Sequence, residues 1–210
     1  LLDHTEETLF QGVRQLRGGE YLEGPIDELP MHVPVRRWYR LTPRVFTGDM
    51  KEAADEFFAV FSNAVTLRLR ADVSIGSCLS GGLDSSSIVC VANQLLRSTG
   101  GESRQATFSA CSNIKRYDER DYVDMVVSQT GAHPHYVYPD LKDLFGMLDA
   151  IAWHQDEPFG STSVYAQWQV FRLAAEAQVK VLLDGQGADE LLAGYPGFFS
   201  PHFGGLVTSM

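Results

Sequence analysis

From residue 51 onward, the sequence alternates apolar runs typical of buried strands with stretches whose apolar residues recur at helical spacing. The strand-like runs cover residues 71–79, 106–111, 136–138 and 179–183. The helical pattern before the fourth run repeats at Val164, Tyr165, Trp168, Phe171 and Ala175. Repeated strand-helix units build a parallel sheet with helices on both faces. The sequence therefore predicts an α/β fold of this kind.

The first 41 residues have a different pattern, and we expect a helix followed by extended pieces there. The apolar residues at the start recur at helical spacing until Gly18 and Gly19, at positions Leu9, Phe10, Val13 and Leu16. Short strand-like runs at 21–22 and 38–39 flank a proline-rich stretch. This is too little apolar sequence for an independent core. Residues 42–50 are typical of a linker.

Composition argues against several classes of protein. A net charge of −10 disfavours a nucleic-acid surface, which needs clustered Lys and Arg. No apolar run reaches the roughly 18 residues of a membrane helix, and the start lacks signal-peptide order, so we expect a cytoplasmic protein without membrane or nucleic-acid partners. Because the chain has no initiator Met, we expect a piece of a longer protein. The sequence leaves a homodimer open.

The cysteines indicate no redox or zinc framework. They are Cys78, Cys90 and Cys111, an odd number without a Cys-x-x-Cys pair. This pattern argues against disulfides, a zinc site or sulfur-transfer chemistry. Reduced, buried thiols are expected.

In parallel sheets, ligands bind beyond the carboxyl ends of the strands. Residues 80–86, which we call the phosphate loop, follow the first strand-like run with the sequence Ser80-Gly81-Gly82-Leu83-Asp84-Ser85-Ser86. Its glycines let consecutive N–H groups face an anion, and a helix beginning near Ser85 adds unpaired donors and the positive end of its dipole. Asp84 would repel a phosphate unless a cation such as Mg²⁺ lay between them, so the loop predicts a metal-bridged phosphate. The alternative is a Gly-Gly turn capped by Asp and Ser.

The phosphate loop resembles the pyrophosphate-binding loop of the ATP-pyrophosphatase (PP-loop) family, whose members cleave ATP to AMP and pyrophosphate. It is not a Walker loop, because no Gly-Lys-Ser/Thr occurs in the chain, and it is not Gly-x-Gly-x-x-Gly. The loop alone leaves several branches of the family open, including synthetases for GMP, NAD and argininosuccinate.

A second motif follows the last strand-like run and narrows this choice. Residues 184–195, the acidic segment, read Asp184-Gly185-Gln186-Gly187-Ala188-Asp189-Glu190-Leu191-Leu192-Ala193-Gly194-Tyr195. They resemble the Gly-Glu-Gly-x-Asp-Glu-x-Phe-Gly-Gly-Tyr segment of asparagine synthetases. Gly185 and Gly187 let the backbone approach a nucleotide, and Asp189 can complete the metal site that Asp84 opens. In the alternative interpretation, the acidic residues only cap a helix.

The resemblance covers nearly the whole chain and implies its domains. Residues 1–41 resemble the end of a glutamine amidotransferase (glutaminase) domain, residues 42–50 a linker, and residues 51–210 the N-terminal part of the synthetase domain, with an adenine nucleotide α-hydrolase-like fold. Residues 107–110 look like the segment whose backbone meets adenine. Residues 156–159 resemble a less specific stretch near the substrate pocket.

The implied activity is that of a carbon–nitrogen ligase with glutamine as amide donor, an asparagine synthetase that uses aspartate, ATP, Mg²⁺ and ammonia from glutamine. The resemblance assigns the metal to Asp84 and Asp189. It assigns catalysis to Asp84, Gln186, Asp189 and Glu190. The residues it implies for ATP or pyrophosphate are Leu79, Ser80, Gly81, Gly82, Asp84, Ser85, Ser86, Ala110, Gly185 and Gln186.

One departure from the family keeps other functions open. Gln186 stands where the family usually has Glu, and an amide cannot accept a proton or balance an ammonium. A related adenylating ligase that closes another amide, as in β-lactam formation or peptide cyclisation, therefore stays an alternative. A nucleotide-binding paralogue without turnover is another.

Overall fold

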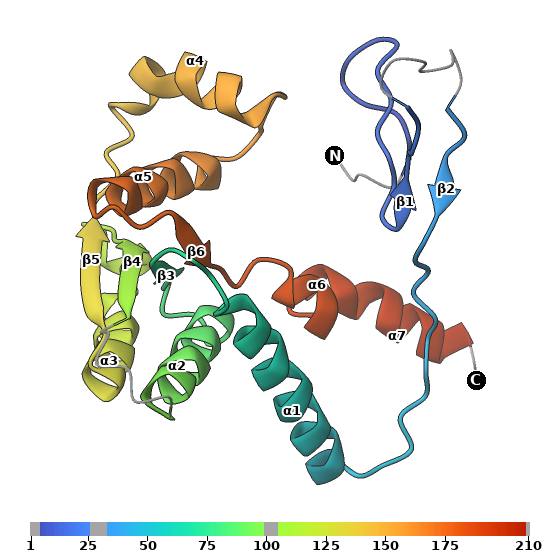
Figure 1. The fold of residues 1–210 in the computed structure, drawn as a ribbon, viewed down its shortest axis with the longest axis horizontal. Helices are drawn as coiled ribbons and strands as arrows, with labels where there is room; N and C mark the ends of the chain where they lie inside the picture. The colour runs from blue at the N-terminus through green and yellow to red at the C-terminus, as the bar shows by residue number, and fades with distance from the viewer. Residues whose placement is uncertain (1–4, 26–32, 99–104, 209–210) are drawn as a thin grey trace.

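The computed structural model describes residues 5–25, 33–98 and 105–208. Its main sheet has four parallel strands in the order β5-β4-β3-β6 (Figure 1). The strands are β3 (Ile75–Cys78), β4 (Ala106–Ala110), β5 (His133–Val137) and β6 (Val181–Leu183). The predicted parallel α/β fold is confirmed.

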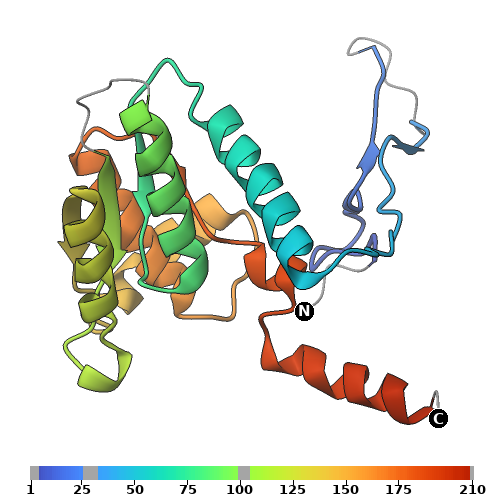
Figure 2. The same cartoon turned by 90° about the horizontal axis from the view of Figure 1, so that it is seen from below.

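Helices cover both faces of this sheet (Figures 1 and 2). On one face lie α1 (Met50–Arg68), α2 (Leu83–Ser98) and α3 (Arg120–Thr130). On the other lies α5 (Ser163–Glu176), and α4 (Leu144–Gln155) packs on α5 farther from the strands. Each face has its own apolar core. Leu79, just after β3, packs against Val89 of α2 and Val123 of α3. Phe108 packs against Val170 and Ala174 of α5.

Close packing explains a glycine in the central strand. Gly76 of β3 is buried, and a Cβ there would lie 2.8 Å from the Phe108 ring and 3.0 Å from a methyl group of Leu182. A larger residue would push α5 away from the sheet, because packed interiors leave no room for an extra methyl group. This matters for function, since α5 forms one wall of the site described below.

Local signals set the ends of two helices. Asp49 and Glu52 form a capping box at the start of α1, with the Glu52 N–H donating to Asp49 Oδ1 at 2.8 Å and the Asp49 N–H to Glu52 Oε2 at 2.9 Å. Gly131 ends α3 in the left-handed conformation with φ +69°, as its position in the sequence predicts. Both devices satisfy backbone groups that a helix end leaves unpaired.

The buried face of α5 differs from the predicted one, and α1 buries only part of its apolar residues. Val65 and Phe61 of α1 pack on the core, but Phe57 and Phe58 nearer its start are half exposed. In α5 the prediction placed Phe171 on the buried stripe, yet it is 48% exposed. The buried side chains of α5 are Tyr165, Gln169, Val170 and Ala174. Gln169 is buried because its amide donates to the Tyr165 hydroxyl at 2.8 Å, which hydropathy alone does not reveal.

The expected helix near the N-terminus is wrong for the residues described there. Residues 5–18 form turns, with an isolated antiparallel bridge between Glu7 and Arg14. The Thr8 hydroxyl accepts from the Phe10 N–H at 3.1 Å and donates to the Val13 carbonyl at 2.8 Å, so it takes backbone groups that a helix would use. Gly12 turns the chain with φ +81°.

The remaining elements lie around this core. The short antiparallel pair β1 (Glu20–Tyr21) and β2 (Arg36–Arg37) stands apart from the main sheet in both views (Figures 1 and 2). After β6 come α6 (Ala188–Leu192), a 3-10 turn at Pro196–Phe198 and α7 (Phe199–Thr208). None of the helices in the described residues is long and apolar enough to cross a membrane.

Candidate functional site

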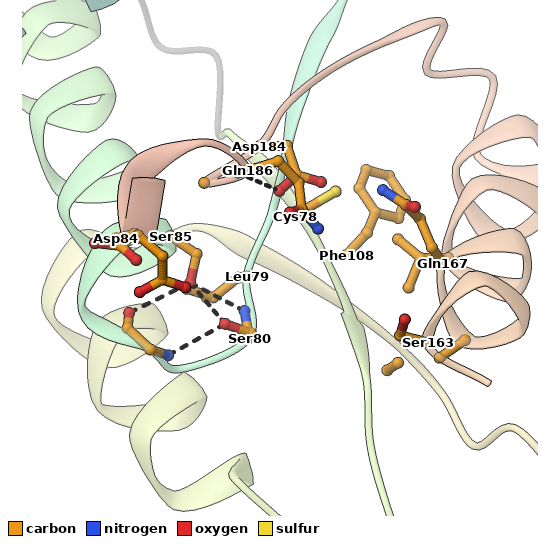
Figure 3. Close-up of a pocket in the computed structure, with 16 residues that line it drawn as sticks. Cys78, Leu79, Ser80, Asp84, Ser85, Phe108, Ser163, Gln167, Asp184 and Gln186 are labelled. Atoms are coloured by element: carbon orange, nitrogen blue, oxygen red, sulfur yellow. Dashed lines mark hydrogen bonds between the residues drawn. The ribbon is translucent and has the colours of Figure 1, made fainter. Parts of the chain in front are cut away.

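A cavity of about 310 Å³ opens at the carboxyl ends of the central strands, where ligands bind in parallel sheets (Figure 3). Its walls come from the phosphate loop, the end of β4, one face of α5 and the acidic segment. The residues that line it are Cys78, Leu79, Ser80, Gly82, Asp84, Ser85, Phe108, Ala110, Ser163, Ala166, Gln167, Val170, Asp184, Gly185, Gln186 and Asp189.

The phosphate loop is a compact turn held by its own serines (Figure 3). Gly81 has φ +86°, a conformation that favours glycine. The Ser80 hydroxyl accepts from the Gly82 N–H at 3.2 Å, and the Ser85 hydroxyl accepts from the Ser80 N–H at 3.2 Å. The two hydroxyl oxygens lie 3.0 Å apart. The loop is therefore ordered by the residues that were predicted to bind phosphate.

Helix α2 begins inside this loop, two residues before the predicted start near Ser85. The Ser86 N–H donates to the Gly82 carbonyl at 3.1 Å, so the N–H groups of residues 83–85 precede the helical hydrogen-bond ladder. Together with the positive end of the helix dipole, they provide donors for an anion. Asp84, in the first turn, lines the cavity beside them.

Two neighbouring elements fix the phosphate loop on the sheet. The Leu79 N–H donates to the Phe108 carbonyl at 2.9 Å, and the Leu79 carbonyl accepts from the buried Ser109 hydroxyl at 2.5 Å. A Cβ on Gly81 would lie 2.9 Å from the Cβ of Tyr122 at the start of α3. The loop is therefore clamped between β4 and α3.

The start of the acidic segment lies against the phosphate loop. A Cβ on Gly185 would lie 3.1 Å from the Asp84 Cβ and 3.2 Å from the Ser85 nitrogen. The Asp184 carboxylate accepts from the Gln186 N–H at 3.2 Å. Two segments a hundred residues apart in the chain thus meet at one point of the cavity wall.

Helix α6, the helical part of the acidic segment, carries two consecutive carboxylates, Asp189 and Glu190, that point to different places. Asp189 lines the cavity, and a Cβ on Gly194 would collide with its Oδ1, so the Asp189 side chain packs over this glycine. Glu190 does not line the cavity but accepts from the Tyr195 hydroxyl at 3.0 Å. This bond is the main cause of a raised pKa at Tyr195.

The wall opposite the phosphate loop comes from α5. Ser163, Ala166, Gln167 and Val170 line it at spacings of three, one and three residues, which places them on one helical face. That this face lines a site was not predicted from the sequence, because only the apolar residues of the helix were considered. The repeated helical spacing of small and polar residues is the signal that could have found it.

The structure brings most of the predicted site residues to this cavity. Gly81, Ser86 and Glu190 do not line it. Residues 156–159, expected near a substrate pocket, lie between α4 and α5 and do not line it either. The predicted residues around the cavity are Leu79, Ser80, Gly82, Asp84, Ser85, Ala110, Gly185, Gln186 and Asp189. Asp184 lines it as well and was not among the predicted site residues.

The side chains of the cavity are acidic or neutral. Asp84, Asp184 and Asp189 line it, and no Lys, Arg or His is among the described residues that form its walls. Burial, and then the neighbouring Asp184 carboxylate, raises the pKa of the Cys78 thiol. Cys78 is therefore a protonated thiol at neutral pH and neither a nucleophile nor a base.

The carboxylates fit a magnesium ion that is held mainly by phosphates. Mg²⁺ prefers oxygen ligands and usually takes one or two carboxylates together with substrate phosphates. Asp84 and Asp189 provide two such groups in the lining of the cavity. Within the described residues, no three His, Cys, Asp or Glu side chains lie close enough to hold a metal by themselves.

The parallel sheet, the glycine-rich loop at a helix start and the acidic segment beside it define an α/β domain of the PP-loop type. Residues 56–206 match the model of the asparagine synthase family. The chain belongs to this family.

Several curated proteins are similar to the chain. A Methanocaldococcus jannaschii protein named "Putative asparagine synthetase (glutamine-hydrolyzing) 2" is 37% identical over 147 residues, 70% of this chain and 27% of that protein. Asparagine synthetase (glutamine-hydrolyzing) 1 of Bacillus subtilis is 32% identical over 146 residues, 70% of this chain and 21% of that protein. Amidase chyE of Penicillium rubens is 28% identical over 204 residues, 91% of this chain and 30% of that protein. The chain thus spans less than a third of each relative.

Proposed function

We propose that the full-length protein is an ATP-dependent amide-forming ligase that activates a carboxylate as its adenylate. The observation that carries this proposal is that the phosphate loop, with Asp84, and the acidic segment, with Asp189, meet at one cavity. A loop of backbone donors suits the pyrophosphate end of ATP, and the end of β4 with Phe108 and Ala110 leaves space for the base. Membership of the asparagine synthase family supports the same reaction.

The specific reaction we propose is glutamine-dependent asparagine synthesis. An oxygen of the aspartate β-carboxylate attacks the α-phosphorus of ATP, and the bond to the bridging oxygen breaks, so that pyrophosphate leaves with the electron pair. Ammonia then attacks the acyl carbon, AMP leaves with its oxygen, and one proton is released. Residues 1–41 would be the end of the glutaminase domain that supplies the ammonia, and the name of the Bacillus subtilis relative, a glutamine-hydrolysing asparagine synthetase, is in keeping with this.

The chain's own residues contribute binding and charge stabilisation. In this proposal, the N–H groups at the start of α2 and the serine hydroxyls of the phosphate loop would donate to the leaving pyrophosphate as its negative charge grows. Preorganised donors of this kind lower a barrier because they need no reorganisation when charge develops. Mg²⁺, held by Asp84 and Asp189, would supply Lewis-acid stabilisation of the phosphate oxygens.

A second candidate is an adenylating ligase that closes a different amide. Gln186, uncharged where asparagine synthetases usually carry Glu, favours it, and so does the similarity to a protein named an amidase. Both candidates share the first half-reaction and differ in the amine and the carboxylate.

Pyrophosphate release by the full-length protein tests the proposal. We expect ATP-dependent release that requires aspartate and Mg²⁺, with asparagine formed when ammonium chloride or glutamine is added. Release with aspartate replaced by another carboxylate, and no asparagine, would favour the second candidate. ATP binding without release of pyrophosphate for any carboxylate would contradict both and leave a binding protein.

A further inference from the structure

We propose that Asp184 is the proton acceptor of the amide-forming step, in the role that the uncharged Gln186 cannot fill. This inference rests on the proposed adenylation and amidation chemistry. Asp184 lies two positions before Gln186, where the family usually has Glu.

The position of Asp184 fits this role. It directly follows β6, lines the cavity and has an exposed side chain near Cys78 (Figure 3). Its Oδ1 accepts from the Gln186 N–H at 3.2 Å, and the carboxylate also accepts from the Cys78 thiol, so both contacts orient it. An ionised carboxylate has about four acceptor sites, so Asp184 can still accept a proton. Gly185, between the two, packs on Asp84, so Asp184 stands beside the phosphate loop.

The other ionisable side chains of the cavity do not compete for this role. They are Cys78, Asp84 and Asp189. Cys78 is held protonated by burial and by Asp184. Asp84 and Asp189 are the residues that fit Mg²⁺, and a carboxylate bound to a cation is a weak base. Asp184 is the carboxylate that remains.

The chemical step needs such a group. When ammonia attacks the acyl adenylate, a C–N bond forms and the attacking nitrogen becomes positively charged. The Asp184 carboxylate takes a proton from this nitrogen, the C–O bond to AMP breaks with its electron pair on the leaving oxygen, and the proton passes later to water. Base help of this kind is worth about 10²–10⁴-fold.

The test compares two half-reactions in the full-length protein with ATP, aspartate and ammonium chloride. We expect Asp184→Asn to slow asparagine formation about 10²-fold while single-turnover pyrophosphate release stays close to wild type. The double variant Asp184→Asn/Gln186→Glu returns a carboxylate two positions along the loop and should recover about tenfold or more of the lost rate. Asp149→Asn, on the exposed surface of α4, is the matched control.

Replacing ammonia by hydroxylamine gives a readout that a structural defect would not move. The nitrogen of hydroxylamine loses its proton more readily after attack, so Asp184→Asn should slow hydroxamate formation much less than asparagine formation. Equal slowing of pyrophosphate release and amide formation, or equal defects with the two amines, would overturn the inference. Wild-type protein that releases no pyrophosphate would instead overturn the proposed function itself, before any variant is compared.

Discussion

At the scale of single residues, Ala193 is held in a conformation that suits glycine. It has φ +56° and ψ +41° at the end of α6, and the family motif that the acidic segment resembles has glycine there. A left-handed conformation costs an L-residue about 1–2 kcal/mol. Glycine loses about 0.4–1 kcal/mol more entropy on folding. We therefore expect Ala193→Gly to stabilise the end of α6 by up to about 1.6 kcal/mol.

Hydrogen exchange of the α6 amides in the full-length protein measures this effect. Slower exchange of residues 188–194 is the expected result. Gly194→Ala is the contrasting variant, because its Cβ would collide with the Asp189 carboxylate, and it should speed exchange and displace that side chain. Faster exchange in Ala193→Gly would show that the turn is not strained.

A second prediction concerns Gly185, where the two halves of the site touch. A methyl group there would lie 3.1 Å from the Asp84 Cβ and 3.2 Å from the Ser85 nitrogen, so the acidic segment must shift by a few tenths of an ångström. We expect Gly185→Ala to weaken ATP binding about tenfold, about 1.4 kcal/mol, without unfolding the protein. Calorimetric titration with ATP measures the change, and Gly146→Ala, which meets open space in α4, is the control. Unchanged affinity would place the nucleotide away from this contact.

The sequence made part of this site predictable at the residue scale. Local motifs identified Ser80, Asp84 and Asp189, because loops between strands and helices carry their chemistry in consecutive residues. Asp184 and Gln167 escaped, since their access to the cavity depends on how β6 and α5 are placed by the sheet. Gly81 and Glu190, which belong to the motifs, turn out to face α3 and Tyr195 instead.

At the scale of elements, the start of α1 depends on one capping box. Asp49→Ala removes the acceptor of the Glu52 N–H and should destabilise the first turn of α1 by about 1 kcal/mol. This corresponds to about fivefold faster exchange of its amides in the full-length protein. Asp55→Ala, which removes only an exposed pair with Lys51, should change exchange by much less. Equal effects of the two substitutions would contradict a special role for the cap.

The order of elements was predictable, but the faces they bury were less so. Alternating strand and helix patterns predicted the sheet, because each element there must bury an apolar surface. The predicted helix at residues 5–18 failed because Thr8 and Gly12 turn the chain locally. The buried face of α5 was misplaced since Gln169 is satisfied by Tyr165, a tertiary contact that no periodicity contains.

At the scale of the whole molecule, the site depends on the sheet order. Strand β6, late in the chain, pairs with β3 in register Ser77 with Leu183, and this pairing brings the acidic segment to the phosphate loop. A ligand that bridges the two loops would therefore bind both halves of the fold. Binding and folding of the domain are linked through it.

The last prediction tests that link with Asp84 and Asp189, which come from α2 and α6. If both hold one Mg²⁺ on the phosphates, Asp84→Asn and Asp189→Asn should each lower pyrophosphate release by about 10²–10³-fold. The double variant should release pyrophosphate only slightly more slowly than the less active single variant, since the effects of residues that act as a unit are not additive. Calorimetric titration with ATP, with and without Mg²⁺, gives a readout that does not depend on turnover. Mg²⁺ should strengthen ATP binding in wild type and in the control Asp72→Asn, which lies in an exposed loop. It should strengthen binding much less in Asp84→Asn or Asp189→Asn. Additive losses, or an unchanged effect of Mg²⁺ on affinity, would mean that the two carboxylates do not share an ion.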